Sequence, residues 1–123
     1  MKLKNDFYHI KEIQSTDNGA NFTVQLNANH FIYAAHFPEN PITPGVCLIQ
    51  MVMELTEELV QAPLFLKVVK NVKFMQVLNP LLHAEVTFVL SVRQEDENHH
   101  KVSAHVDSGS NTFAKMILQL VKI

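Results

Sequence analysis

The sequence is poor in cysteine and glycine, and it has no long apolar run. A single cysteine, Cys47, among 123 residues excludes an internal disulfide framework and fits a reducing compartment. The three glycines form no phosphate-cradling loop, so no nucleotide or other cofactor is implied. Charged residues interrupt each apolar stretch well before it reaches a membrane-spanning length. The first residues lack the apolar segment of a secretory signal, so we expect a cytoplasmic protein.

The net charge of −2 gives no global basic field that would favour nucleic acid or an anionic membrane as partner. The histidines show no metal-ligand spacing, and residues 95–100, which include His99 and His100, are predicted to form a solvated hairpin tip. A length of 123 residues with 47% apolar residues indicates one domain over residues 1–123, large enough to bury its own core.

The apolar pattern predicts one long helix in an otherwise β protein. No helix breaker occurs from Gly45 to about Gln61, and apolar residues cover most of the early surface, as in a buried helix. Thr43 is the expected N-cap, and Pro63 ends the helix. Asn18-Gly19 suits a hairpin with positive φ. Strands are expected over 7–14, 21–27, 64–74, 83–94, 101–107 and 112–122, and three prolines make 28–44 a rigid irregular loop.

This order of elements predicts an α+β fold with a long central helix against an antiparallel β-sheet. The helix covers one face of the sheet, and the opposite face also needs covering. Exposed sheet edges and faces favour association with another chain, so the pattern favours a dimer.

Residues Ala35 to Gln50, AHFPENPITPGVCLIQ, resemble the pattern G-H-F-P-G-x-P-x-x-P-G-V-x-x-x-E of FabA/FabZ-type 3-hydroxyacyl-[acyl-carrier-protein] dehydratases. The His, Phe, Gly and Val and all three prolines match in register. A weaker match pairs Lys73-Phe74 and Pro80 with the family's K-F-R-R-P-V-x-P-G-D stretch, although the arginines and the Gly-Asp are missing. The resemblance implies the hotdog fold and a dimer with its sites at the dimer interface.

The resemblance also implies a lyase that dehydrates 3-hydroxyacyl thioesters of acyl-carrier protein or CoA, as in fatty acid biosynthesis. In that reaction a base removes the C2 proton while charge develops on the thioester oxygen. His36 matches the histidine base, and the amide of Gly45 matches the group that polarises the thioester carbonyl. Phe37 and Val46 match positions that wall the acyl channel, although simple packing is the commoner role for such residues.

Gln50 departs from the pattern, because the family has a carboxylic acid at this position. A carboxamide donates hydrogen bonds but does not give up a proton near neutral pH. Glu54 follows one turn later on the same helix face, so a carboxylate–carboxamide pair is kept with its members exchanged. A buried Glu54 is therefore a candidate acid. The alternative is a structural carboxylate bonded to Gln50 or to backbone.

Several functions stay open at this point. The leading hypothesis is a dehydratase acting through His36, Gln50 and Glu54. A second is a subunit without complete catalytic machinery, whose related partner supplies the acid. An acyl thioesterase that uses Glu54 to activate water, and an acyl-binding module without chemistry, are the other two. For assembly, a homodimer, a trimer of dimers and a heteromer with a related dehydratase are all compatible with the sequence.

Overall fold

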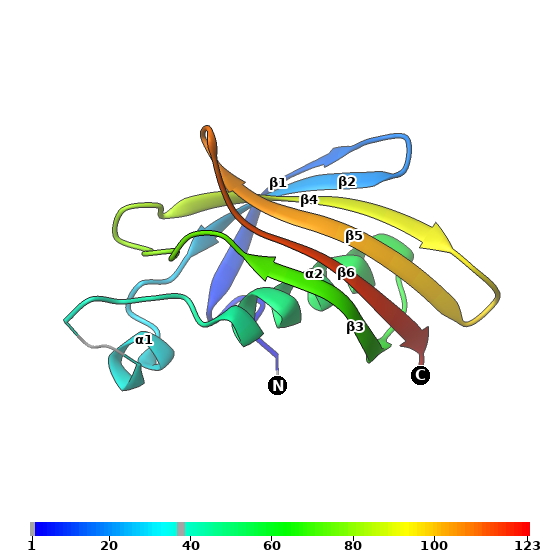
Figure 1. Ribbon diagram of the computed structural model, residues 1–123, viewed down its shortest axis with the longest axis horizontal. Helices are drawn as coiled ribbons and strands as arrows, with labels where there is room; N and C mark the ends of the chain where they lie inside the picture. The colour runs from blue at the N-terminus through cyan, green and yellow to red at the C-terminus, as the bar shows by residue number, and fades with distance from the viewer. Residues whose placement is uncertain (1, 37–38) are drawn as a thin grey trace.

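The computed structural model describes residues 2–36 and 39–123, and its elements follow the predicted order (Figure 1). The predicted helix is α2 (Gly45–Val60), and each predicted strand is present with its ends shifted by at most a few residues. The strands are β1 (Tyr8–Ser15), β2 (Gly19–Leu26), β3 (Leu64–Phe74), β4 (Glu85–Gln94), β5 (His99–Ser108) and β6 (Asn111–Lys122).

All six strands form one antiparallel sheet in the order β1-β2-β4-β5-β6-β3. The sheet curves over α2, which lies beneath it in the view of Figure 1. Strand β3 follows α2 in the sequence but lies at the far edge, where it pairs with the last strand, β6. A long helix wrapped by an antiparallel sheet is the hotdog architecture, so the predicted fold class is confirmed.

The core lies between α2 and the face of the sheet that points toward it. Strand β2 alternates strictly, with Phe22 and Val24 fully buried between partly exposed residues, as expected for a strand with one covered face. Met51, Val52 and Leu55 of α2 are also fully buried. Because buried apolar side chains are the main source of stability, this layer holds α2 firmly in place.

The prediction of an irregular loop over residues 28–44 is wrong at its beginning, because a short helix, α1 (Phe31–Ala35), forms there. The side chain of His30 caps this helix by accepting a 3.1 Å hydrogen bond from the amide of Ile32. Tyr33 is buried, and its ring stacks on Phe7 with centroids 5.1 Å apart. Long-range packing thus creates a helical turn that the local sequence does not indicate.

Two predictions about helix and turn ends also need correction. The N-cap of α2 is Pro44, without a side-chain cap; the hydroxyl of Thr43 instead lies 2.9 Å from that of Tyr33. Gly19 begins β2 and does not have positive φ. A Cβ at Gly19 would lie 2.1 Å from the carbonyl oxygen of Leu90, so close approach of two strands requires this glycine.

The predicted solvated tip over residues 95–100 is too long. Strand β5 already begins at His99, and His100 points toward the core with 4% of its surface exposed. Both ring nitrogens of His100 are buried without a hydrogen-bond partner among the described residues. Strand alternation puts His100 on the inner face, beside the apolar Leu120 of β6.

Edge strand β3 is apolar and largely exposed. Phe65, Leu66, Val68, Val69 and Phe74 are each 39–56% exposed. Two register shifts relative to β6 leave Lys67 and Lys70 as extra residues, which are β-bulges. An edge with this much exposed apolar surface is suited to association with another chain. Among the described residues, no helix combines the length and apolar character needed to cross a membrane.

Candidate functional site

The first turn of α2 offers backbone amides that the helix itself cannot satisfy. Pro44 precedes it with extended φ and ψ of −62° and 142°, and its carbonyl accepts hydrogen bonds from the amides of Cys47 and Leu48. Gly45 is the first helical residue, as predicted. The free amides and the positive end of the helix dipole make this turn favourable for an oxygen that gains negative charge.

The ring of Phe74, at the end of β3, packs directly against Gly45. A Cβ built on Gly45 would lie 2.5 Å from the ring atom Cζ of Phe74, which is far closer than a normal carbon contact. Glycine is therefore required for this approach of strand and helix. The sequence comparison had singled out both residues but had not indicated that they touch.

Val46 is 65% exposed, so it does not pack within the chain. The ring of Phe74, which packs against the preceding Gly45, is also 49% exposed. Apolar surface left uncovered beside free amides is suited to an acyl chain or to a second subunit. The predicted role of Val46 as a channel wall is compatible with this exposure, while packing inside the chain is not.

His36 lies directly after α1. Its backbone N–H donates a 3.0 Å hydrogen bond to the carbonyl of Ile32, which ends the short helix. The His36 side chain is exposed, so it is accessible to a ligand or a partner subunit. Phe37, the other predicted site residue of this segment, lies outside the described residues.

Glu54 is only 3% exposed, and its carboxylate accepts four hydrogen bonds. Oxygen Oε1 accepts from the backbone N–H of Lys4 at 2.8 Å and from the hydroxyl of Tyr8 at 3.1 Å. Oxygen Oε2 accepts from the backbone N–H of Leu3 at 2.8 Å and from the side-chain amide of Gln50 at 2.7 Å. Four donors match the capacity of a carboxylate, so Glu54 ties residues 3–8 to the middle of α2.

Burial and this carboxylate change the acidity of nearby groups. Burial, together with the negative charge of Glu54, raises the pKa of Tyr8 far above its usual value of 10.0. Burial raises the pKa of Tyr33 to about 12. Burial also raises the pKa of the Cys47 thiol, so it is not an activated nucleophile. Tyr8 therefore stays protonated and acts as a permanent donor to Glu54.

The structure brings together Gln50 and Glu54, and it brings Gly45 against Phe74. His36 is not among the four donors to Glu54. Sequence reasoning missed Tyr8 and the backbone of Leu3 and Lys4, because nothing local indicates a contact across about fifty residues. No group of three His, Cys, Asp or Glu side chains in the described part of the chain could hold a metal ion.

Comparison with solved structures supports the fold. An uncharacterised protein from Erwinia carotovora subsp. atroseptica superposes with a TM-score of 0.66 at 21% identity, over 94% of this chain and 93% of that one. The dehydratase heterocomplex ApeI:P from Xenorhabdus doucetiae gives 0.65 at 23% identity, over 93% and 95%. A mutant thioesterase from Pseudomonas aeruginosa gives 0.64 at 11% identity, over 94% and 81%.

Comparison of the sequence with protein-family models identifies the family. No curated protein sequence matches the chain. The sequence model of the ApeI-like family, described as ApeI dehydratase, matches residues 12–116. That range includes both α2 and the segment that carries His36 and Gly45, and it spans most of the chain. The broader expectation of a dehydratase-type hotdog protein is thus confirmed, and the chain belongs to the ApeI-like dehydratase family.

Proposed function

We propose that this protein is the His36-bearing subunit of a 3-hydroxyacyl thioester dehydratase, and that a second subunit supplies the acid. The observation that carries this proposal is the saturated carboxylate of Glu54. This carboxylate accepts four hydrogen bonds, two of them from backbone amides, and so anchors residues 3–8 to α2. Gln50, at the position of the usual acid, has no proton to give near neutral pH.

His36 removes the C2 proton of the substrate, and the electron pair moves toward C1 of the thioester. The carbonyl oxygen gains negative charge, which the amides of the first turn of α2 stabilise from Gly45 onward. The hydroxyl group then leaves C3 as water after accepting a proton from the acid of the second subunit. The products are a 2-enoyl thioester and water. This reaction is of the FabA/FabZ type, with the acid supplied by a partner of different sequence.

The exposed edge strand β3 supports a two-subunit site. Its apolar residues, among them Phe65 and Val69, remain uncovered in the single chain. Pairing of two β3 edges would continue the sheet into a second subunit and cover this surface. The similar fold of a dehydratase heterocomplex from Xenorhabdus doucetiae is consistent with a partner of related sequence. We favour such a heteromer over a homodimer, because two copies of this chain would both lack a free helix carboxylate.

The test is a thioester assay on the isolated chain and on the complex that co-purifies from the native cell. Each is incubated with 3-hydroxyacyl and 2-enoyl thioesters of CoA and of acyl-carrier protein, and their interconversion is followed. We expect little turnover by the chain alone and clear turnover by the complex. In the complex, His36→Ala should lower the rate by about 10²–10⁴, the usual contribution of a general base.

His9→Ala is the matched control, because His9 is exposed on β1 and away from α2. Full activity of a strict homodimer would contradict the requirement for a second subunit, and an unaltered rate in His36→Ala would contradict the dehydratase proposal. Release of free thiol without interconversion would identify a thioesterase. A bound acyl thioester that stays unchanged would identify a binding module.

A further inference from the structure

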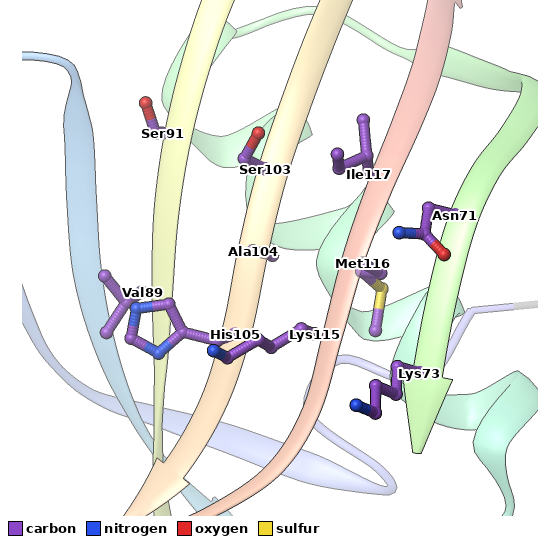
Figure 2. A pocket seen from close by; sticks show the side chains of 10 residues that line it. All are labelled: Asn71, Lys73, Val89, Ser91, Ser103, Ala104, His105, Lys115, Met116 and Ile117. Atoms are coloured by element: carbon purple, nitrogen blue, oxygen red, sulfur yellow. The ribbon is translucent and has the colours of Figure 1, made fainter. Parts of the chain in front are cut away.

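The face of the sheet opposite α2 has a pocket of about 430 Å³, formed by strands β3 to β6 (Figure 2). On β6, the lining residues Lys115 and Ile117 alternate with Met116 and Leu118, which are buried against the core. Side chains alternate between the two faces of a strand, so Lys115 and Ile117 point away from α2. The pocket is therefore separate from the first turn of α2 and from the Glu54 carboxylate.

One row of this pocket is basic across three neighbouring strands. Lys73 of β3 is directly opposite Lys115 of β6, and Lys115 is directly opposite His105 of β5. Figure 2 shows these three side chains at the same end of the pocket. Like charges placed directly opposite each other destabilise a sheet, so the Lys73–Lys115 pair has a cost in stability.

Little negative charge offsets this row. Among the described residues, neither lysine forms an ion pair, and the one carboxylate paired with the row is Asp107, whose Oδ2 lies 2.8 Å from Nδ1 of His105. That contact fixes the His105 ring. It does not offset the positive charges of Lys73 and Lys115. A chain with a net charge of −2 thus concentrates positive charge at one end of a pocket.

The other lining side chains are either apolar or carry hydroxyl or amide groups that can form hydrogen bonds. Val89 continues the basic row on β4, directly opposite His105, and Ile117 lies in the next row with the hydroxyls of Ser91 and Ser103, as Figure 2 shows. The volume falls in the range of small-molecule sites, which combine an apolar lining with a few polar groups that orient the ligand. The site therefore suits a small molecule with an anionic end and an apolar body.

We propose that this pocket binds a phosphate ester with a small apolar group. The phosphate lies on the row Lys73–Lys115–His105, where two ammonium groups match its double negative charge. The apolar group lies over Ile117, which follows Lys115 by two residues on the same face of β6. A small ligand fits better than an extended acidic protein, because the next row, Asn71–Ile117–Ser103–Ser91, is uncharged and separates the basic row from Arg93 and Lys101 farther along the sheet. Arg93 already has Glu95 at 3.6 Å.

Binding is tested with phenyl phosphate, inorganic phosphate and phenol on the ¹⁵N-labelled full chain, at constant ionic strength. We expect phenyl phosphate to bind more tightly than either of the other two and to shift the amide signals of Lys115 and Ile117. Lys115→Gln and Lys73→Gln should each weaken phenyl phosphate binding roughly five- to tenfold. Lys101→Gln, which removes the same charge from the same face outside the pocket, should change the affinity less than roughly twofold.

Each variant is also unfolded in urea, which separates loss of the site from loss of the fold. Removing either member of the Lys73–Lys115 pair should leave the urea midpoint unchanged or raise it. The absence of saturable phenyl phosphate binding at millimolar concentration would overturn the proposal. Equal weakening by Lys101→Gln would show that only general charge attraction is involved. Tighter binding of a poly-glutamate peptide at the same amides would also overturn it, in favour of an acidic protein partner.

Discussion

The side-chain amide of Gln50 donates a 2.7 Å hydrogen bond to Oε2 of Glu54, one helical turn further along α2. The two residues therefore act together, with the amide as donor and the carboxylate as the acceptor for three more groups. This geometry explains why the carboxamide stands at position 50 and the carboxylate at position 54, the reverse of the order in the FabA/FabZ pattern. A carboxylate at position 54 is the one that reaches the backbone of Leu3 and Lys4.

The first prediction concerns that anchor. Glu54→Gln replaces a fully paired carboxylate by a carboxamide whose NH₂ faces other donors. We expect the free energy of unfolding to fall by about 1.5–3 kcal/mol, the range for hydrogen bonds to charged groups. The measurement is urea unfolding followed by circular dichroism. Glu58→Gln is the control, because Glu58 lies near the same segment and forms only a partly exposed ion pair with Lys4. An equal loss in both variants would contradict the anchoring role.

Gln50→Glu should make the stability of the fold depend on pH. The new carboxylate would lie next to that of Glu54, and two adjacent carboxylates raise the pKa of the pair because both cannot easily ionise. A raised pKa in the folded state gives stability that is present at low pH and lost as the pH rises. We therefore expect the variant to lose stability, relative to the wild type, between about pH 4.3 and neutrality. Urea midpoints of both proteins across this range measure the effect, and a constant difference would contradict it.

Gly45→Ala should be destabilising because of Phe74. The added Cβ would meet the ring at 2.5 Å, so the half-exposed ring must move away. Phe74→Leu removes the ring and should relieve the clash. The coupling energy of the double-mutant cycle is expected to be about 0.5–3 kcal/mol, the range for residues in contact. Additive effects of the two substitutions in urea unfolding would show that they do not interact.

His100 should make the protein sensitive to mild acid. Burial, assisted by the positive charge of Lys122, lowers the pKa of His100 below its usual value of 6.5. The unfolded chain then takes up a proton that the folded state resists. Stability contributed by the neutral ring is complete above pH 6.5 and is lost as the pH falls below it. His100→Leu should remove this component of the pH dependence, which urea midpoints at several pH values would show. His99→Gln is the neighbouring control and should retain it.

Both tyrosines should resist ionisation. The chain has two, Tyr8 and Tyr33, and burial raises the pKa of each above 10.0. A folded-state pKa above the unfolded value gives stability that is lost as the pH rises, here beyond about pH 10. Ultraviolet titration should therefore show little phenolate at pH 10 in the native protein, whereas about half of the tyrosine should be ionised at that pH in urea. Normal titration of one tyrosine in the native state would contradict its burial.

Much of the fold could be predicted because local patterns and the tertiary structure agree. The run from Gly45 to Val60 has helical spacing throughout, and β3 has the predicted bounds Leu64 and Phe74. The failures have the opposite cause. Helix α1 depends on Tyr33 stacking against Phe7, and burial of His100 depends on its alternation within β5. The stacking of Tyr33 is not visible in a short window of sequence, whereas His100 does continue the alternation of Val102 and Ala104 and could have been placed in the core.

The candidate site was predicted less completely, for a related reason. The residue types at His36 and Gly45 indicate thioester chemistry through their motif, and their catalytic roles stay predictions. Three of the four partners of Glu54 come from residues 3–8, about fifty residues away, so the sequence alone left open whether its carboxylate is free. The contact between Gly45 and the Phe74 ring likewise depends on the tertiary fold, because residue 45 and residue 74 belong to different elements.

The position of β3 in the sheet also bears on how the chain folds. Strands β4, β5 and β6 are joined by short turns and pair in sequence order, so their contacts form at a low cost in loop-closure entropy. Strand β3 must wait for β6, since its pairing joins Leu64 to Lys122. Contacts between distant residues slow folding. We expect β3 to join the sheet last, and the strand that forms latest would then be the one that meets a second subunit during assembly.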